Sequence, residues 1–461
     1  MPQTSIPPPQ RRHLPPITAV ETADKISQLP DVLLTKILSL LPTKQSVRTG
    51  ILSKRWRPLW TSVPILDFDD EIPFDRSESV IGRREDLKIQ NWTGFTDFVY
   101  SVFLFYEAEP VNRFRLRCAN CSDSNITAWV GQAVQRKVKE IELTLSLSRY
   151  VALPRRLFNC DTVSVMKLNG VFLNALISLS VKLPRLRVLH VGDRVLFGCH
   201  DCIVMLLNGC PILEDLSIES TYSDACGGRV CAKADFELNL KYLVKAKIGF
   251  SWKKICQKSM FLFFQALSNV RFLSITHSTA AFADCRKVSA MKGSKKFQSR
   301  AEEGRSDPKQ GFRANPKCLK YASASDIPIF NNLIQLEISF GNYYWDLLAK
   351  LLQNSRRLET LIIHKETQKY TKGQDSKWNH PLHVPDCLLV HLKTFCLKEY
   401  QGWESEKEFV GYILQNARVL ETMTIYIASS LELDAQLQIR RNLSTLQRSF
   451  QSCQISLNLV S

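Results

Sequence analysis

The sequence predicts an α/β protein in which a compact helical module precedes a curved solenoid built on a parallel sheet. Two observations support this fold class. A segment between residues 24 and 60 is unusually apolar for a helical region. Further along, a strand-like pattern of apolar residues recurs ten times between Val138 and Leu420. A chain of 461 residues has room for both parts.

The first helix of the module is expected to begin at Pro30 and Asp31, since a fixed φ and an acidic group both suit a helix N-terminus. Pro42 ends it. Apolar residues between these points cover almost the whole circumference of the helix. They are Leu33, Leu34, Ile37, Leu38, Leu40 and Leu41.

Two more helices are expected to complete the module. Thr43 is placed to cap the second, and Ser53 to cap a third. Pro58 should end or kink the third helix because it lacks an N–H. The apolar residues assigned to these helices are Val47, Ile51, Trp56 and Trp60.

The module carries more apolar surface than it can bury. A helix that is apolar all round must be covered on more than one side, and about 45 residues enclose too little volume to do this alone. The surplus predicts a second protein as partner. The alternative is a helical hairpin that belongs to the protein's own core.

This segment resembles the F-box, the motif that binds the Skp-family adaptor of cullin-RING ubiquitin ligases. Ser53 and Arg55 belong to the run Leu52-Ser-Lys-Arg-Trp56, which is the plant-type signature. The resemblance implies an adaptor-binding role for the other matching residues. These are Leu29, Pro30, Ile37, Leu38, Leu41, Pro42, Val47, Leu52, Trp56 and Trp60.

The repeated pattern is apolar-x-x-apolar-x-apolar, with spacings of 23 to 34 residues and one interval of 63. This is the period of leucine-rich repeats, in which each unit supplies a short parallel strand and a return segment. Stacked units bury one another's apolar faces, giving a curved sheet with a continuous core. The units begin at Val138, Val163, Leu186, Leu213, Leu243, Val270, Leu333, Leu358, Leu392 and Leu420.

Apolar stripes before the first repeat predict two connecting helices, one from Asn91 and one around Trp129. The C-terminal part resembles the FBD domain of plant F-box proteins, through Tyr400-Gln-Gly402 and the run from Tyr412 to Glu421. The pattern of this part predicts a strand, a helix and a strand in phase with the repeats. An amphipathic helix and a closing strand are predicted to follow. The apolar residues of these last elements are Phe409, Val410, Ile413, Leu414, Ile439, Leu443, Leu446, Phe450, Cys453, Ile455, Leu457 and Leu459.

The pattern fails between Asp284 and Lys320, where eleven basic and four acidic residues predict a solvated, disordered insertion. Lys292-Gly-Ser-Lys-Lys296 could be a nuclear address or a polyanion contact, but we favour a loop without function or a gene-model artefact. The net charge of +17 raises nucleic acid as a partner. The residues expected on the concave sheet are mixed in sign, however, so a solvated positive excess is the better interpretation. They are Lys167, Lys245, Lys247, Lys398, Glu140, Glu142, Asp215, Glu219 and Glu337.

Two close cysteine pairs, Cys118 with Cys121 and Cys199 with Cys202, have a spacing used for zinc, and His200 lies inside the second pair. The pairs are about 80 residues apart, further than a compact zinc fold allows. We therefore expect no metal, and buried free thiols instead. Reduced cysteines fit the cytosol or nucleus, which are the expected compartments of a chain without a secretory signal.

No phosphate loop or nucleophile elbow occurs, and no cofactor is implied. The resemblance to the plant F-box/FBD/leucine-rich-repeat family implies a non-catalytic substrate receptor of an SCF-type ubiquitin ligase. Its partners would be a Skp-family adaptor, through it a cullin, and an unknown target protein. The alternatives are a nucleic-acid-binding protein that uses the basic insertion, and a scaffold that binds the adaptor without promoting ubiquitination. The expected domains are a Pro-rich disordered tail (1–22), the F-box (23–70), connecting helices (71–136), repeats (137–380, with the insertion at 284–320), and the FBD domain with a C-terminal cap (381–461).

Overall fold

A computed structural model describes the fold of the chain. The described residues are 25–26, 28–70, 84–146, 150–173, 180–197, 201–219, 221–222, 238–249, 263–275, 327–340, 345–365, 378–444 and 453–459. The predicted tail, the basic insertion, Cys199, His200, Leu446 and Phe450 lie outside these ranges.

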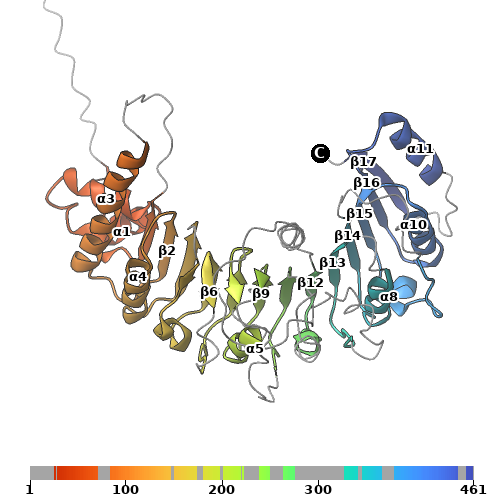
Figure 1. The fold of residues 1–461 in the computed structure, drawn as a ribbon, viewed down its shortest axis with the longest axis horizontal. Coiled ribbons are helices and arrows are strands. Elements are labelled where there is room, and N and C mark those ends of the chain that lie inside the picture. The colour runs from red at the N-terminus through yellow and green to blue at the C-terminus, as the bar shows by residue number, and fades with distance from the viewer. Residues whose placement is uncertain are drawn as a thin grey trace, which may run out of the picture.

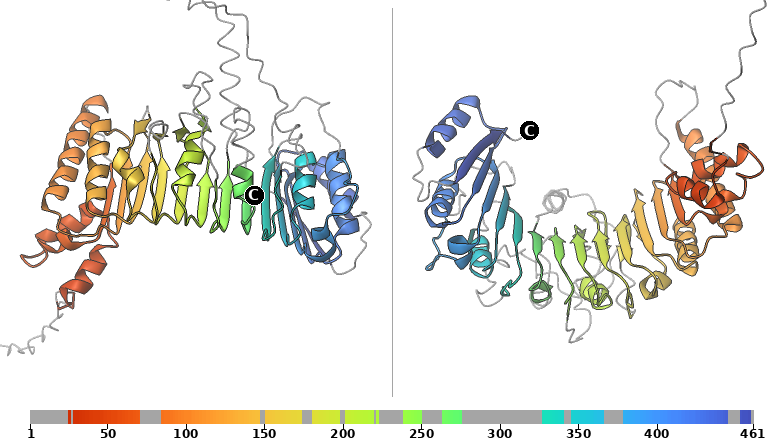
Figure 2. Two further views of the ribbon diagram at one scale, coloured as in Figure 1. Left: turned by 90° about the horizontal axis from the view of Figure 1, so that it is seen from below. Right: turned by 180° about the vertical axis from the view of Figure 1, so that it is seen from behind.

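The described chain forms an arch whose inner side is one parallel sheet of 13 strands (Figure 1). Figure 2 shows the same strands side by side from behind and from below. In sheet order they are β1 (Ile65–Asp69), β2 (Arg113–Cys118), β3 (Glu140–Leu145), β5 (Val165–Asn169), β7 (Val188–Val191), β9 (Asp215–Ile218), β11 (Lys245–Ile248), β12 (Phe272–Ile275), β13 (Gln335–Phe340), β14 (Thr360–Lys365), β15 (Thr394–Tyr400), β16 (Thr422–Ile427) and β17 (Gln454–Leu459).

The repeat pattern located ten of these strands correctly. Each strand from β3 to β16 in the sheet begins two residues after the predicted start of its unit, as Asp215 follows Leu213. The strands pair in matching register, so that Asp215 lies between Val188 and Lys245. The register also crosses the long interval, because β12 pairs directly with β13 through Phe272 and Gln335. The sheet therefore continues directly from β12 to β13, although the basic insertion separates these strands in the sequence.

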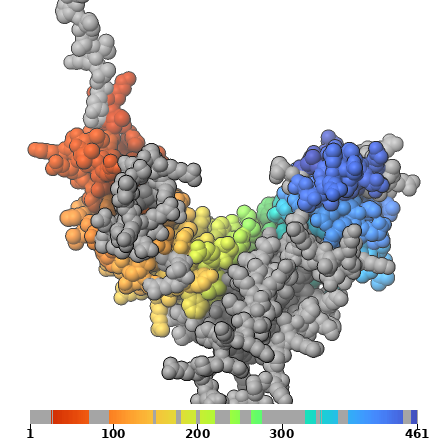
Figure 3. All heavy atoms as spheres, turned by 45° about the horizontal axis from the view of Figure 1, so that its top comes forward, coloured from red at the N-terminus to blue at the C-terminus, as the bar shows by residue number. Residues whose placement is uncertain are grey.

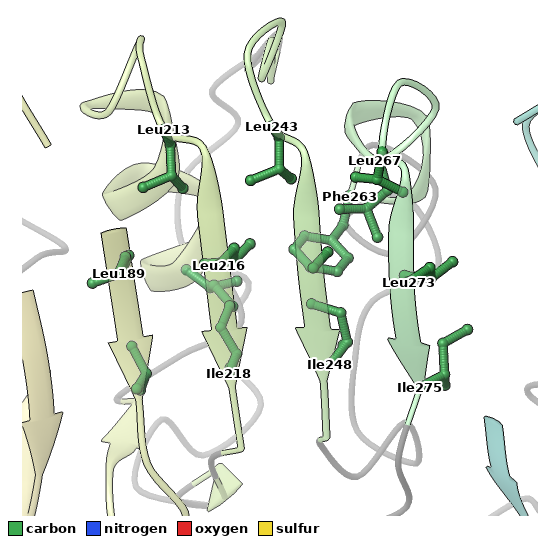
Figure 4. Packing of buried hydrophobic residues seen from close by; sticks show 14 of the residues in the cluster. Leu189, Leu213, Leu216, Ile218, Leu243, Ile248, Phe263, Leu267, Leu273 and Ile275 are labelled. Atoms are coloured by element: carbon green, nitrogen blue, oxygen red, sulfur yellow. The ribbon is translucent and has the colours of Figure 1, made fainter. Parts of the chain in front are cut away.

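Leucine side chains at matching positions build the core. Leu213, Leu216 and Ile218 are at most 1% exposed, and the equivalent residues of the neighbouring units pack against them (Figure 4). The alternate residues of each strand face the inner side of the arch and stay partly exposed. One continuous core runs from Leu66 to Cys453.

Helices on the outer side of the arch complete the repeats (Figure 1). They include α5 (Asp201–Asn208), α8 (Trp345–Gln353), α9 (Asp386–Val390), α10 (Glu404–Asn416) and the 3-10 helix η3 (Arg155–Asn159). A second parallel sheet of two- and three-residue strands, which no sequence pattern predicted, joins successive early repeats. Its members are β4 (Val151–Ala152), β6 (Val171–Leu173), β8 (Leu196–Phe197) and β10 (Thr221–Tyr222).

The two connecting helices are confirmed as α3 (Arg84–Phe105), which begins seven residues earlier than expected, and α4 (Asp123–Gln135). Trp129 of α4 is fully buried, and Phe95 and Tyr100 of α3 contact it edge-on. At the far end, α10 buries Phe409, Val410 and Ile413, and α11 (Leu433–Ser444) and β17 close the solenoid. None of the described helices is long and apolar enough to cross a membrane.

Candidate functional site

The N-terminal module, residues 25–70, is built from α1 (Asp31–Leu38), α2 (Thr43–Arg48) and the 3-10 helices η1 (Thr49–Ile51) and η2 (Leu59–Ser62). The first helix begins after Pro30 as predicted. The prediction that Thr43 caps the second helix is wrong, because Pro42 occupies the cap position. The Thr43 hydroxyl instead accepts a hydrogen bond from the Asp67 backbone N–H at 2.7 Å.

The predicted third α-helix is also wrong. Turns follow Ser53, and the only helical structure after them in the module is the four-residue η2, which starts directly after Pro58. Proline removes a backbone donor and fixes φ, so an α-helix started near Ser53 cannot continue through this position. Arg55 orders the turn region: its guanidinium pairs with Asp31 at 2.6 Å and donates to the Leu29 carbonyl.

The structure divides the ten predicted adaptor-binding residues into three groups. Leu38 and Trp56 are buried, at 0% and 6% exposure, in a small core of the module shared with Leu34, Leu59 and Val63. A second group is half-buried and packs on that core or on the solenoid. A third group is exposed. The half-buried residues are Leu29, Leu41, Val47 and Trp60, and the exposed ones are Pro30, Ile37, Pro42 and Leu52.

Sequence matching missed further exposed apolar residues in the same module. We define the apolar face as the exposed large apolar side chains of α1, the turn after it, and the η1 region. Its members, with exposed fractions, are Val32 (68%), Leu33 (43%), Ile37 (42%), Leu40 (83%), Ile51 (85%) and Leu52 (64%). Together with Ile26, they make up a third of all exposed large apolar side chains in the described chain. The all-round apolar pattern of the first helix was the signal for the members on α1 and the turn after it.

The module is firmly joined to the solenoid. Its last segment is β1, the edge strand of the main sheet, which pairs with β2 from Ile65 to Asp69. The Tyr106 hydroxyl donates to the Val63 carbonyl at 2.6 Å, and burial raises the pKa of this phenol. The Thr61 carbonyl accepts hydrogen bonds from two backbone N–H groups that follow α3. The apolar face is therefore held in a fixed orientation relative to the repeats.

The inner side of the arch is open between the N-terminal module and the C-terminal units (Figure 3). Its charged side chains pair across neighbouring strands. Arg115 on β2 lies 3.4 Å from both Asp67 on β1 and Glu142 on β3, and Asp215 on β9 lies 3.4 Å from His190 on β7. The expected mixture of signs is present, and the pairing leaves no basic stripe on these strands.

The expectation of free thiols is wrong for Cys118 and Cys121, which form a disulfide. Cys118 ends β2 and Cys121 precedes α4, which brings their Cα atoms to 6.0 Å, within the range that a disulfide spans. Asp70 lies beside them and accepts hydrogen bonds from Ala119 and Asn120. These three side chains are the one potential metal-ligand group among the described residues, and the disulfide withholds both thiolates.

Six further described cysteines lie outside this disulfide, and most of them are buried. Burial raises the pKa of Cys210 to about 12 and that of Cys387 to about 12, so both stay protonated at neutral pH. Neither is suited to act as a nucleophile or a metal ligand. The six cysteines are Cys160, Cys202, Cys210, Cys387, Cys396 and Cys453.

Comparison with known proteins gives three family matches that coincide with these parts. Residues 26–68 match the F-box domain, residues 126–233 match the LRR repeats of FBD-associated F-box protein At5g56370, and residues 380–425 match the FBD. Two proteins of Arabidopsis thaliana, F-box/FBD/LRR-repeat proteins At4g00160 and At3g52680, are each 30% identical to this chain. The first alignment covers 95% of both proteins, and the second covers 95% of this chain and 94% of the relative.

The chain belongs to the F-box/FBD/LRR-repeat protein family. The F-box match is the N-terminal module, the LRR match covers the solenoid from α4 to β10, and the FBD match covers β15, α10 and most of β16. A further relative, putative FBD-associated F-box protein At3g50710 of the same plant, is 29% identical over 94% of this chain and 100% of its own length. An F-box followed by leucine-rich repeats supports a substrate-adaptor role in SCF-type ligases.

Proposed function

We propose that this protein is the substrate-recognition subunit of a cullin-RING ubiquitin ligase of the SCF type. The observation that carries the proposal is the apolar face of the F-box, which stays exposed although the small F-box core beneath it is complete. Large apolar side chains gathered on one short module suit burial against a second protein. A Skp-family adaptor, and a cullin bound through it, are the partners that fit an F-box.

The contribution of this subunit would be positional. Its F-box docks on the adaptor, its repeat surface holds a target protein, and the conjugating enzyme elsewhere in the complex transfers ubiquitin. The continuous sheet from β1 into the repeats fixes the distance between the two binding surfaces. A fixed distance raises the effective concentration of target lysines near the activated ubiquitin. The protein itself would be non-catalytic, acting in the nucleus, the cytoplasm or both.

Affinity purification with and without proteasome inhibition tests this role. Wild-type protein should recover a Skp-family adaptor and a cullin, together with target proteins that accumulate when the proteasome is inhibited. The variant Ile37→Asp with Leu52→Asp places charges on the apolar face and should lose the adaptor and the cullin. Recovery of the adaptor without any protein that responds to the inhibitor would favour a scaffold. Recovery of nucleic acid in place of the adaptor would contradict the proposal.

A further inference from the structure

A groove runs along the edge of the main sheet where the strands begin, in the middle of the arch. It has a volume of about 890 Å³, and five consecutive repeats line it. The turns before β11, β12, β13, β14 and β15 contribute, at equivalent positions, Tyr242, Asn269, Asn332, Arg357 and His391. Because these strands are neighbours in the sheet, the five side chains form a row across the repeats.

The groove has an excess of positive charge. Lys241, Arg271 and Arg357 line it, all three are exposed, and none of them takes part in an ion pair within the described part of the chain. The carboxylate in the groove, Glu359, already pairs with Lys393 at 3.2 Å. The excess positive charge is thus not neutralised by acidic side chains among the described residues around it. Charge complementarity therefore favours an anionic ligand.

The rest of the lining fits a polypeptide. Tyr242 and Val244 are 61% and 39% exposed, which places apolar surface beside the cations. Asn269 and Asn332 are exposed, and each amide can both donate to and accept from an extended backbone.

We propose that this groove binds an extended acidic segment of the target protein, lying across the strands. Neighbouring strands are about 4.8 Å apart, so the row from β11 to β15 spans about 19 Å, which is about six residues of extended chain. Acidic side chains would accept the charge-assisted hydrogen bonds of Arg271 and Arg357. This inference rests on the proposed receptor function and names the chemistry of its target.

The test is fluorescence anisotropy with the purified full-length protein and a labelled octapeptide of alternating Glu and Val. A peptide with Gln in place of Glu is the control ligand. The variant Arg271→Glu with Arg357→Glu reverses two charges in the groove. The matched control, Arg155→Glu with Arg156→Glu, makes the same change in overall charge at two exposed arginines of η3. Thermal melts and adaptor pulldown verify that all variants are folded and retain F-box docking.

We expect saturable binding of the acidic peptide, weakened about tenfold or more by the groove variant and unchanged by the η3 variant. The Gln peptide should bind at least about tenfold more weakly than the acidic one. Equal binding by the groove and η3 variants would overturn the proposal, as would no saturable binding or tighter binding of single-stranded DNA. If wild-type protein failed to bind the adaptor in the pulldown, the receptor function itself would be refuted instead.

Discussion

Lys365 and Glu406 form an ion pair in the interior of the protein, with their side chains 6% and 0% exposed. Lys365 ends β14, and Glu406 lies in the first turn of α10 in the FBD. The other oxygen of Glu406 accepts the backbone N–H groups of Gln401 at 3.1 Å and Trp403 at 2.9 Å. The Trp403 ring covers the ammonium at 3.5 Å. Burial raises the pKa of Glu406, and the Lys365 charge opposes that rise.

Breaking this pair should destabilise the protein more than removing both charges. Lys365→Met and Glu406→Gln each leave one buried group without its partner, and each should lower the free energy of unfolding by about 3–5 kcal/mol. In the double variant no charge is stranded, and the introduced amide oxygen would still accept the two backbone hydrogen bonds. The loss in the double variant should be smaller than the sum of the single losses. Denaturant unfolding of the four proteins measures this coupling, and strict additivity would refute it.

Deletion of residues 284–320 should leave the solenoid intact. The strands on either side of the insertion, β12 and β13, already pair through Phe272 and Gln335. Shortening a loop costs little free energy, so the thermal midpoint and adaptor binding should stay nearly unchanged. A collapse of soluble yield, measured beside wild type, would show that the insertion contains a structural repeat.

Stability should depend on pH through His364. The residue lies on the inner sheet face 2.9 Å from Glu337, and burial followed by the Lys398 charge lowers its pKa below 6.5. A lowered folded-state pKa means that the unfolded chain binds the proton more readily. Stability is then complete above pH 6.5 and decreases as the pH falls towards the folded-state pKa. In the His364→Gln variant, the free energy of unfolding should change less with pH over this window. Denaturant unfolding at several pH values measures this dependence. If the variant and wild type showed the same dependence on pH, the assignment would be contradicted.

Truncation before Pro385 should destabilise the repeats upstream of the FBD. It removes β15, the partner of β14, and exposes the buried Leu361 and Ile363 at the new end of the solenoid. An uncapped solenoid presents its core to water, so protection of β13 and β14 in hydrogen exchange should fall. Unchanged protection, together with independent folding of the isolated C-terminal piece, would show that the FBD is a separate domain.

The repeat architecture could be predicted because each strand carries its own local signal. Leu213, Leu216 and Ile218 follow one another within six residues, and the same spacing marks every unit. The Lys365–Glu406 pair joins residues 41 positions apart and has no local pattern. The disulfide was missed for a related reason, since the spacing of Cys118 and Cys121 also suits zinc or free thiols. The strands of the second sheet are too short for periodicity to reveal.

The candidate site was predicted as a motif, without its geometry. Leu38 and Ile37 are adjacent in the sequence, yet one is fully buried and the other is 42% exposed. A motif match reports both kinds of residue because both are needed, one to build the F-box and one to present its surface. Only the packing of α1 on Trp56 separates these roles.

Adaptor binding by the apolar face is the central claim, and isothermal titration of a purified Skp-family adaptor tests it most directly. Wild-type protein should bind, and Ile37→Asp with Leu52→Asp should weaken binding by about 2 kcal/mol or more without changing the thermal midpoint. The matched control, Leu382→Asp with Leu433→Asp, alters two exposed leucines far from the F-box and should bind as wild type does. If both double variants bound the adaptor as tightly as wild type, the apolar face would not be the docking surface.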